Sequence, residues 1–562
     1  MISMDIRLFV LENAVKYNGK ASIGSVVGKI LAEHPEEKSR MKELMSEIKL
    51  VVDTVNSMSP EEQVNELLEH NPHYYKTEKE ESKKRAEERK ELPELKNAVM
   101  GQVVTRIPPE PSKYNHVGHA ITFLLNYMYA KKYQGKCILR YEDTNPEKST
   151  QEFVDAMNED VLEYLDIHPD QVVFVSDHLL KYIEMAGQLI TDGHAYTCRC
   201  LQEKISHNRR EMIDCSCRET THTSNDWQSM KAGKFVEGEI TLRLKISMQH
   251  KNAVMRDPVI FRLCYDPHYR QGMKYKVWPV YDFENAIEEG LLGVTHVLRS
   301  NEFESRIELQ EYIRNLFSLP HPTIKQYARV NIADATTQGR EIRALIESGN
   351  YLGWDDPRLV TLRALKRRGI VKEAYFDLAK VVGMSKTPSE IDFAVIASIN
   401  RKLLDASAKR FFFIHHPKMI QIKQAPPLDV DLKFHPDGER GRTFHTSDEF
   451  YIEEEDYHKF VDGELIRLMD CLNFTKEKKI FSFESVEHEK YRGSSGPIIH
   501  WLPVDNIIDV EVLMPDISVL KGYGEGTLSI LQIGDVIQFE RFAFCRLDSI
   551  ENGVYKFWYT HK

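Results

Sequence analysis

The chain has 562 residues, of which 42% are hydrophobic and 29% charged, enough for several globular domains. The net charge of −11 gives no support to a nucleic-acid partner, although local basic surface decides such binding more than the total does. No apolar run is long enough to cross a bilayer, and the charged start of the chain is unlike a secretory signal, so we expect a cytoplasmic protein without a membrane partner.

The first 92 residues are predicted to form a helical N-terminal extension. Apolar residues recur at helical spacing in three stretches, 6–15, 23–31 and 41–58. Residues 76–91 are almost wholly charged, which predicts a solvated helix or linker and a domain boundary. We expect the extension to be a structural or docking bundle.

The stretch 106–120, RIPPEPSKYNHVGHA, lies between a predicted strand and a predicted helix (120–133). A strand, a tight turn and a helix together make the geometry in which a helix N-terminus binds phosphate. His116 and His119 fall on one helical turn, and Gly118 lets a flat base or ribose approach the backbone. Imidazoles donate to phosphate oxygens and favour charge on a transferring phosphoryl group. Alternatively, the histidine pair caps the helix or binds a metal.

Strands and helices alternate from residue 101, which predicts a parallel sheet with a nucleotide at the C-terminal ends of its strands. Strand 136–141 (KCILRY) is followed directly by Glu142. A carboxylate at a strand end in a cleft suits an ammonium group. The alternative is that this acidic stretch caps the next helix through Asp143 or Thr144, and both can hold. The other predicted elements are a helix at 151–165, a strand at 172–176 and a helix at 179–192.

Four of the eight cysteines form two Cys-x-Cys pairs within residues 198–217. Four thiolates supply one tetrahedral zinc shell, and so few cysteines in so long a chain fit a reducing compartment rather than a disulfide scaffold. The predicted ligands are Cys198, Cys200, Cys215 and Cys217. The alternatives are unmetallated thiols, or His207 in place of one ligand.

Strands return after residue 237, beginning with 238–246. Arg299 ends the run GVTHVLR, and its guanidinium suits a carboxylate ligand far better than a neutral amide. The alternative partner for Arg299 is Glu302 or Glu304. Residues 354–368 are predicted to be helical with a basic face suited to phosphates, and short strands from about residue 400 onward predict β-barrel structure.

Three of these stretches resemble class I aminoacyl-tRNA synthetases of the glutamyl and glutaminyl subfamily. Stretch 106–120 is similar to the first class I signature, R-F-P-P-E-P-x-G-Y-L-H-I-G-H-A in this subfamily. Residues 140–146 resemble R-F-D-D-T-N-P, and 269–299 resemble W-P-x-Y-D-F-A followed by G-V-T-H-V-L-R. Lys113, where the family prefers glycine, is the one departure in the first signature that could alter the turn. The other departures are Ile107, Asn115 and Val117.

The resemblance implies roles for individual residues. It implies that His116 and His119 are catalytic and that they bind ATP together with Pro109 and Gly118. It assigns the amino-acid pocket to Arg106, Glu142, Tyr281 and Arg299. Glutamyl enzymes have an arginine at position 299 and glutaminyl enzymes do not, which favours glutamate.

The second class I signature, a lysine-bearing loop of K-M-S-K-S type, departs from the family pattern. Counting back from Gly353-Trp354 places it at 337–341, where Gly339 stands at the lysine position and Glu341 at a position that is often basic. Arg340 and Arg343 are the candidates to supply to ATP the positive charge of the missing lysine.

The expected architecture is multidomain, α/β followed by β, with a Rossmann-like catalytic domain, a helical N-terminal extension and C-terminal anticodon-binding β-barrels. The expected parts are a helical extension (1–92), the two halves of the catalytic domain (93–195 and 276–330), an acceptor-binding insertion with the cysteines (196–275), a signature loop with a stem-contact region (331–399) and two barrels (400–562).

The resemblance, to the archaeal type of glutamyl-tRNA synthetase, implies ATP-dependent charging of tRNA(Glu) with L-glutamate through an adenylate. It also implies that tRNA binds before activation, that Mg²⁺ accompanies ATP and that the cysteines hold structural Zn²⁺. It implies no oligomeric state. The alternatives are a catalytically weakened tRNA-binding paralogue, a glutaminyl-tRNA synthetase and another nucleotidyltransferase with an HxGH motif.

Overall fold

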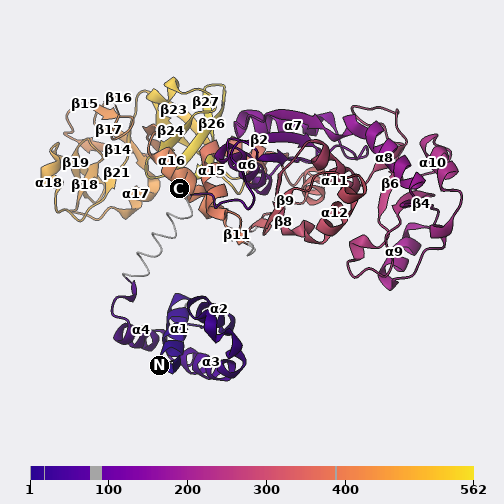
Figure 1. The fold of residues 1–562 in the computed structure, drawn as a ribbon. Coiled ribbons are helices and arrows are strands. Elements are labelled where there is room, and N and C mark those ends of the chain that lie inside the picture. The colour runs from indigo at the N-terminus through magenta and orange to yellow at the C-terminus, as the bar shows by residue number, and fades with distance from the viewer. Residues whose placement is uncertain (1, 18, 76–90, 334, 386–388, 439) are drawn as a thin grey trace. The chain divides into compact units, whose positions relative to one another are not determined.

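The computed structural model describes residues 2–17, 19–75, 91–333, 335–385, 389–438 and 440–562. The chain forms two compact units, Met1–Glu91 and Leu92–Lys562 (Figure 1). Within the described ranges, no helix has the length and apolar character needed to span a membrane. Apart from residue 91, the predicted charged linker at 76–91 lies outside the described residues.

The first unit is a bundle of helices. Its long helices are α1 (Ile2–Lys16), α2 (Ile23–Glu33), α3 (Met41–Asn56) and α4 (Pro60–His70). All three stretches with helical spacing fall in helices, except for residues 57 and 58, and their apolar faces meet α4 in a core around Val10, Ile48 and Leu67. Ser59 starts α4 with a reciprocal capping box to Glu62. The unit thus has its own core.

The second unit is built on a parallel sheet, as the alternating pattern predicts. Strands β1 (Val104–Ile107), β2 (Lys136–Tyr141) and β3 (Gln171–Phe174) pair in parallel, and α6 (Val117–Lys132) connects the first two. Strands β8 (His296–Ser300) and β9 (Thr323–Tyr327) also pair in parallel. The amide of Thr295 donates to the carbonyl of Val104, so this pair lies beside β1. The resulting order, β3-β2-β1-β8-β9, is Rossmann-like and opens a crevice between β1 and β8.

Helices follow the sheet strands with one departure from expectation. The predicted helix at 151–165 is α7 (Gln151–Asn158), which continues as a π-helical segment, Glu159–Tyr164. Helix α8 (Leu179–Thr191) ends before Gly193, whose φ of 75° only glycine adopts readily.

An antiparallel sheet is inserted between β3 and β8. It consists of β4 (Ala195–Cys198), β5 (Thr241–Leu244), β6 (Val259–Leu263) and β7 (Val277–Pro279) in that order, with α9 (Gln202–Glu211) and α10 (Thr223–Lys231) in its connections. Buried Trp227, Phe261 and Trp278 form part of a core that this sheet shares with α8, α11 (Tyr281–Leu291) and α12 (Ile307–Leu316).

A helical region connects the sheet to the C-terminal part. It holds β10 (Val330–Ile332), α13 (Gly339–Glu347), α14 (Leu362–Arg368), α15 (Lys372–Val382), β11 (Ser389–Ile391) and α16 (Phe393–Asp405). The prediction of one helix over 354–368 is wrong, because the Asp356 carboxylate accepts from the amides of Leu352 and Arg358 and closes a turn there. Helix α14 starts only after Thr361, whose side chain caps it.

The basic face predicted on this segment is largely committed to other contacts. Arg367 pairs with Asp548 and Asp355, each at 2.7 Å, and Arg368 is buried and donates to the carbonyl of Thr560 at 3.1 Å. These two arginines therefore anchor α14 to the C-terminal part of the chain.

The C-terminal part consists of two closed sheets. The first barrel contains β14 (Pro417–Lys423), β17 (Glu449–Glu453), β18 (Leu465–Leu468), β19 (Asn473–Glu477), β20 (Ile480–Ser485), β21 (Ile498–Ile499) and β22 (Leu502–Pro503), with a hairpin of β15 (Asp429–Lys433) and β16 (Arg440–His445). The second barrel contains β12 (Arg410–Phe411), β13 (Phe413–His415), β23 (Ile507–Leu513), β24 (Val519–Glu525), β25 (Val536–Phe539), β26 (Ala543–Glu551) and β27 (Val554–His561).

Each sheet closes because its two outer strands belong to one short stretch of chain. In the second barrel, β12 pairs with β25 at one end of the strand order and β13 pairs with β24 at the other, with only Phe412 between β12 and β13. In the first barrel, β21 and β22 are likewise the two outer strands, and only two residues separate them in the chain. Closure removes the exposed edges that would otherwise pair with other chains.

Candidate active site

A cavity of about 780 Å³ opens at the C-terminal ends of β1, β2 and β8, in the crevice expected for this strand order. Eight residues that the sequence assigned to ATP or the amino acid line it: Arg106, Pro109, His116, Gly118, His119, Glu142, Tyr281 and Arg299. The fold thus gathers residues from five separate segments into one site.

The two histidines start α6 and are neutral. His116 is the N-cap residue, and its Nδ1 accepts from the amide of Gly118 at 3.1 Å; Nδ1 of His119 accepts from the amide of His116 at 3.2 Å. Burial lowers the pKa of His116 to about 3 and the pKa of His119 well below its usual value. Because Nδ1 accepts in both neutral rings, each ring carries its proton on Nε2 and offers one N–H donor. Capping and phosphate binding are therefore compatible, but the histidines bring no positive charge.

Arg299 at the end of β8 is a buried cation with free donors. Its side chain is 4% exposed, and no group in the described ranges hydrogen-bonds to its three guanidinium nitrogens. It lies over the Phe303 ring, 5.4 Å from the centroid, and burial lowers its pKa although Tyr281 and Glu289 oppose the shift. The alternative salt bridge to Glu302 or Glu304 is not formed. An unpaired buried guanidinium in a cavity is costly unless an anion binds it.

Glu142 follows β2 and keeps one oxygen free. Its Oε1 accepts from Nε of Arg140 at 2.7 Å, whereas no described group donates to Oε2. Burial raises the pKa of Glu142, and the charge of Arg140 opposes the rise. Within the same acidic stretch, Asp143 accepts from the amide and hydroxyl of Ser176 at 2.8 Å, so it holds the short 3-10 helix Val175–His178 after β3 and does not cap α7, which Thr150 caps.

Arg106 is held by a carboxylate that sequence reasoning missed. Its Nε donates to Glu289 on α11 at 3.0 Å, and Arg314 donates to the other oxygen of Glu289. Burial opposes ionisation of Glu289, but the charges of Arg106, Arg140 and Arg314 lower its pKa overall. Glu289 sits in the run FENAIEEGL among several acidic residues, and nothing in that pattern distinguishes it from a solvent-exposed glutamate.

Arg340 and Arg343 are not gathered into the cavity. Both lie exposed on α13, and neither lines the cavity. Glu341 accepts from the hydroxyl of Thr336 at 2.6 Å. Gly339, by contrast, packs against Lys113, and Lys113 lines the cavity.

The four cysteines converge on one point in the inserted sheet. The Sγ atoms of Cys198 and Cys215 lie 3.7 Å apart, those of Cys200 and Cys215 3.8 Å, and those of Cys200 and Cys217 3.9 Å. Four sulfurs around one zinc with bonds near 2.3 Å are separated by about 3.8 Å, so the donor set fits the ion. His207 is not part of the group.

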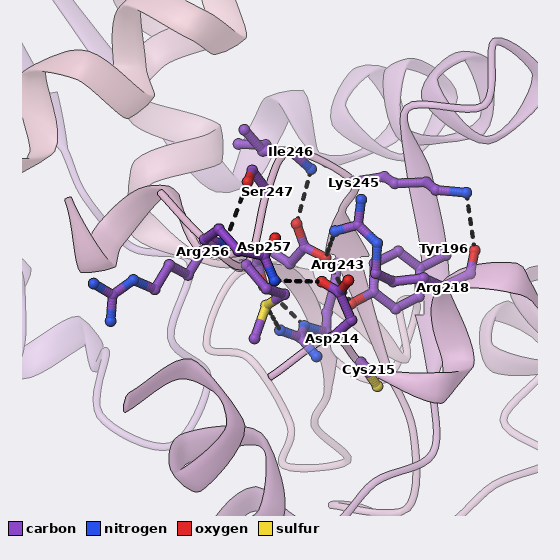
Figure 2. Close-up of polar contacts among 12 residues, drawn as sticks. Tyr196, Asp214, Cys215, Arg218, Arg243, Lys245, Ile246, Ser247, Arg256 and Asp257 are labelled. Atoms are coloured by element: carbon purple, nitrogen blue, oxygen red, sulfur yellow. Dashed lines mark hydrogen bonds and ion pairs between the residues drawn. The ribbon is translucent and has the colours of Figure 1, made fainter. Parts of the chain in front are cut away.

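A buried polar cluster supports the cysteines (Figure 2). Nη1 of Arg243 lies 3.8 Å from Sγ of Cys198, and its Nε donates to the carbonyl of Asp257 at 2.8 Å. The fully buried Asp257 carboxylate accepts from Tyr196 at 3.1 Å, from the amide of Ile246 at 2.9 Å and from Arg218. A cation beside the sulfurs and a fixed frame behind them suit negatively charged thiolates.

Comparison with known proteins agrees with this geometry. Residues 102–406 match the model of the catalytic domain of class I tRNA synthetases (E and Q), and residues 408–490 and 498–548 match the models of the anticodon-binding domains of that family. Glutamate–tRNA ligase from Pyrococcus furiosus is 37% identical over 99% of this chain and 98% of its own length. The enzyme from Nitrosopumilus maritimus is 38% identical over 100% and 99%.

A solved glutamate–tRNA ligase from Elizabethkingia meningosepticum aligns with 55% of this chain and 70% of its own, at 15% identity and a TM-score of 0.39. The matched models cover both the cavity and the two barrels, and the curated relatives match along the whole length. The chain therefore belongs to the class I tRNA synthetases for glutamate and glutamine, and within them to the glutamate–tRNA ligase family.

Proposed function

We propose that this chain attaches glutamate to tRNA(Glu), using ATP and releasing AMP and pyrophosphate. The observation that carries the proposal is Arg299, a buried guanidinium with unpaired donors facing the cavity. A carboxylate side chain would pair with it, whereas a neutral amide would leave the charge uncompensated. Glutamate therefore fits this pocket better than glutamine.

The other residues of the cavity take complementary roles in this proposal. The free Oε2 of Glu142 receives the ammonium group of glutamate, and the Tyr281 hydroxyl together with Arg106 lines the side-chain pocket. The Nε2–H donors of His116 and His119 face the phosphates of ATP, with Pro109 and Gly118 against the nucleotide.

The chemistry is positioning and charge stabilisation. The α-carboxylate of glutamate attacks the α-phosphorus of ATP, the bond to the bridging oxygen breaks, and pyrophosphate leaves. The 2′-hydroxyl of the terminal tRNA ribose then attacks the glutamyl carbonyl and AMP leaves. Bound groups held in line supply much of the rate, and fixed donors at the phosphates supply more.

We assign the remaining parts as follows. The inserted sheet binds the acceptor end of tRNA, the two barrels bind the anticodon, and the N-terminal unit is a structural or docking module of a cytoplasmic enzyme. Magnesium would accompany ATP. Cys198, Cys200, Cys215 and Cys217 would hold one zinc ion, whose role is to fix the fold of a loop that has little core of its own.

Glutamate-dependent exchange of pyrophosphate into ATP, with and without tRNA, tests the proposal. We expect exchange with glutamate, none with glutamine, and a requirement for tRNA(Glu). A chain that binds tRNA(Glu) but exchanges no pyrophosphate would instead be the weakened paralogue.

Metal analysis of the purified chain tests the zinc assignment. We expect one zinc per chain in the native protein, and loss of that zinc in Cys215→Ser. Cys471→Ser is the matched control, because Cys471 is a buried cysteine in the first barrel. Native protein without zinc, or equal zinc in both variants, would contradict the assignment.

A further inference from the structure

The phosphate end of the cavity needs a positive charge that its histidines do not carry. His116 and His119 are neutral, because burial holds their pKa values far below neutrality. Neutral donors orient phosphate oxygens but cannot balance the several negative charges of a triphosphate. Beside the magnesium that would accompany ATP, a cationic side chain near α6 would balance more of this charge.

Lys113 is a cation in the right place with no partner. It lies in the turn between β1 and α6, lines the cavity, and is close enough to both histidines to lower their pKa values further. Across the described ranges, no carboxylate forms an ion pair with it and no side chain hydrogen-bonds to it. Burial lowers the pKa of its ammonium group, and although Glu110 and Glu302 oppose that shift, neither lies within ion-pair distance. A half-buried ammonium without a counter-ion is completed by an anionic ligand.

The other cation close to the histidines is already neutralised. Arg329 also lines the cavity, but its Nη1 lies 2.8 Å from Oε1 of Glu302. Arg340 and Arg343 are exposed on α13 and outside the cavity lining. Among the residues that the structure describes, Lys113 therefore brings the unpaired charge nearest the histidines.

The stem of Lys113 leaves little room for a side chain at position 339. A Cβ atom at Gly339 would lie 3.2 Å from Cβ and 3.3 Å from Cδ of Lys113, closer than side chains normally pack. The backbone at Gly339 does not have a left-handed φ, so space rather than conformation favours glycine there. Lys113 likewise has no positive φ, so the turn needs no glycine at position 113. Lys113 and Gly339 thus pack against each other, and a larger residue at position 339 would crowd the stem of Lys113.

We propose that Lys113 binds the β- and γ-phosphates of ATP and supplies the charge that the lysine position of the second signature, Gly339, lacks. The inference rests on the proposed function. The ammonium group reaches the phosphates from the turn before α6 instead of from the N-terminus of α13. Pyrophosphate leaves with more negative charge than it carries in ATP, so the contact strengthens as the reaction proceeds.

Lys113→Gln tests the proposal, because it keeps most of the stem and removes the charge. In glutamate-dependent pyrophosphate exchange with tRNA bound, we expect the rate to fall by about 100- to 1,000-fold, as for removal of one charge-stabilising donor. The KM for ATP should rise and the KM for glutamate should stay within about twofold, a split that general loss of structure would not give. Lys131→Gln, an exposed lysine on the last turn of α6, is the matched control and should behave as wild type.

A second test moves the positive charge from position 113 to position 339. Lys113→Gly should be as slow as Lys113→Gln, and Lys113→Gly combined with Gly339→Lys should recover at least about tenfold of the rate, because removing the Lys113 stem opens the space at 339. Unchanged exchange in Lys113→Gln would overturn the proposal. Slow exchange in Arg340→Ala or Arg343→Ala would then place the charge on α13 instead.

Direct binding of ATP separates this proposal from the proposed function. If wild type gives no glutamate-dependent exchange, the function fails, and equilibrium binding of ATP then decides the role of Lys113. About tenfold weaker binding by Lys113→Gln than by wild type and Lys131→Gln would uphold it. Equal binding by all three would reject it.

Discussion

At the glutamate end of the cavity most of the charges are buried and paired with one another, with Arg299 left for the ligand, whereas at the phosphate end the charge of Lys113 lies on the turn before α6. Glu289 is fully buried and holds Arg106 and Arg314, and Arg140 holds Glu142. At the other end, Lys113 packs against Gly339 without an ion pair among the described residues, and the neutral histidines are half-buried. A locked network fixes which amino acid is accepted, while a charge at a turn can move between neighbouring positions without disturbing the core.

Glu289→Gln should have the largest effect on stability if the glutamate end is a locked network. The substitution leaves Arg106 and Arg314 buried without a counter-charge, which typically costs about 3–5 kcal/mol. Urea unfolding of the purified chain measures the loss. Glu302→Gln is the control: its pair with Arg329 is about half exposed, and we expect a loss below about 1 kcal/mol. Equal losses in the two variants would remove the contrast between the two ends.

The second largest expected effect is that of Arg299→Cys on the choice of amino acid. Loss of a charge-assisted partner in a closed site should weaken glutamate use by about 2–4 kcal/mol in kcat/KM, while activity with glutamine should not fall with it. Aminoacylation with each amino acid gives the numbers. Tyr281→Phe keeps the guanidinium and should lose much less. An unchanged preference for glutamate in Arg299→Cys would show that selection lies elsewhere.

The neutral histidines predict a smaller, pH-dependent effect. His116 has a pKa of about 3 in the folded chain against an ordinary value of 6.5, so below pH 6.5 the unfolded chain binds a proton that the folded chain does not. Its contribution to stability is complete at neutral pH and falls by at most about 2 kcal/mol between pH 7 and pH 5. Unfolding midpoints of wild type and His116→Gln at both pH values measure this.

The control for that experiment is His168→Gln, which removes an exposed histidine. We expect the acid-induced loss to be smaller in His116→Gln than in wild type and unchanged in His168→Gln. Identical pH dependence in all three would mean that the pKa of His116 is the same in the folded and unfolded chain, and the phosphate end would then gain positive charge below about pH 6.5.

Much of this fold follows from local pattern. Strand β2 has the predicted bounds, and the helices of the first unit fall where apolar residues recur at helical spacing. The failure at 354–361 has a local cause: the Asp356 carboxylate competes with the helix for backbone amides, which hydrophobic spacing does not reveal.

Which residues contact one another in space was harder to predict than where each functional residue lies in the sequence. Eight of the ten residues assigned to ATP and the amino acid line one cavity, since they sit in recognisable stretches. The role of Glu289 depends on a contact with Arg106, 183 positions away, and that of Lys113 on a contact with Gly339. A single sequence gives no sign of which distant residues meet, so neither contact could be foreseen.

The closure of the second barrel constrains the order in which the chain can fold as it is synthesised. Its two outer strands, β12 and β13, are made before the entire first barrel, but their partners β25 and β24 come after it. The first barrel draws its strands from residues 417–503 and can close while synthesis continues. Residues 410–415 must wait for their strand partners until residues 519–539 are made. The anchoring of Arg367 to Asp548 waits with them, so the catalytic region gains this support only when the chain is nearly complete.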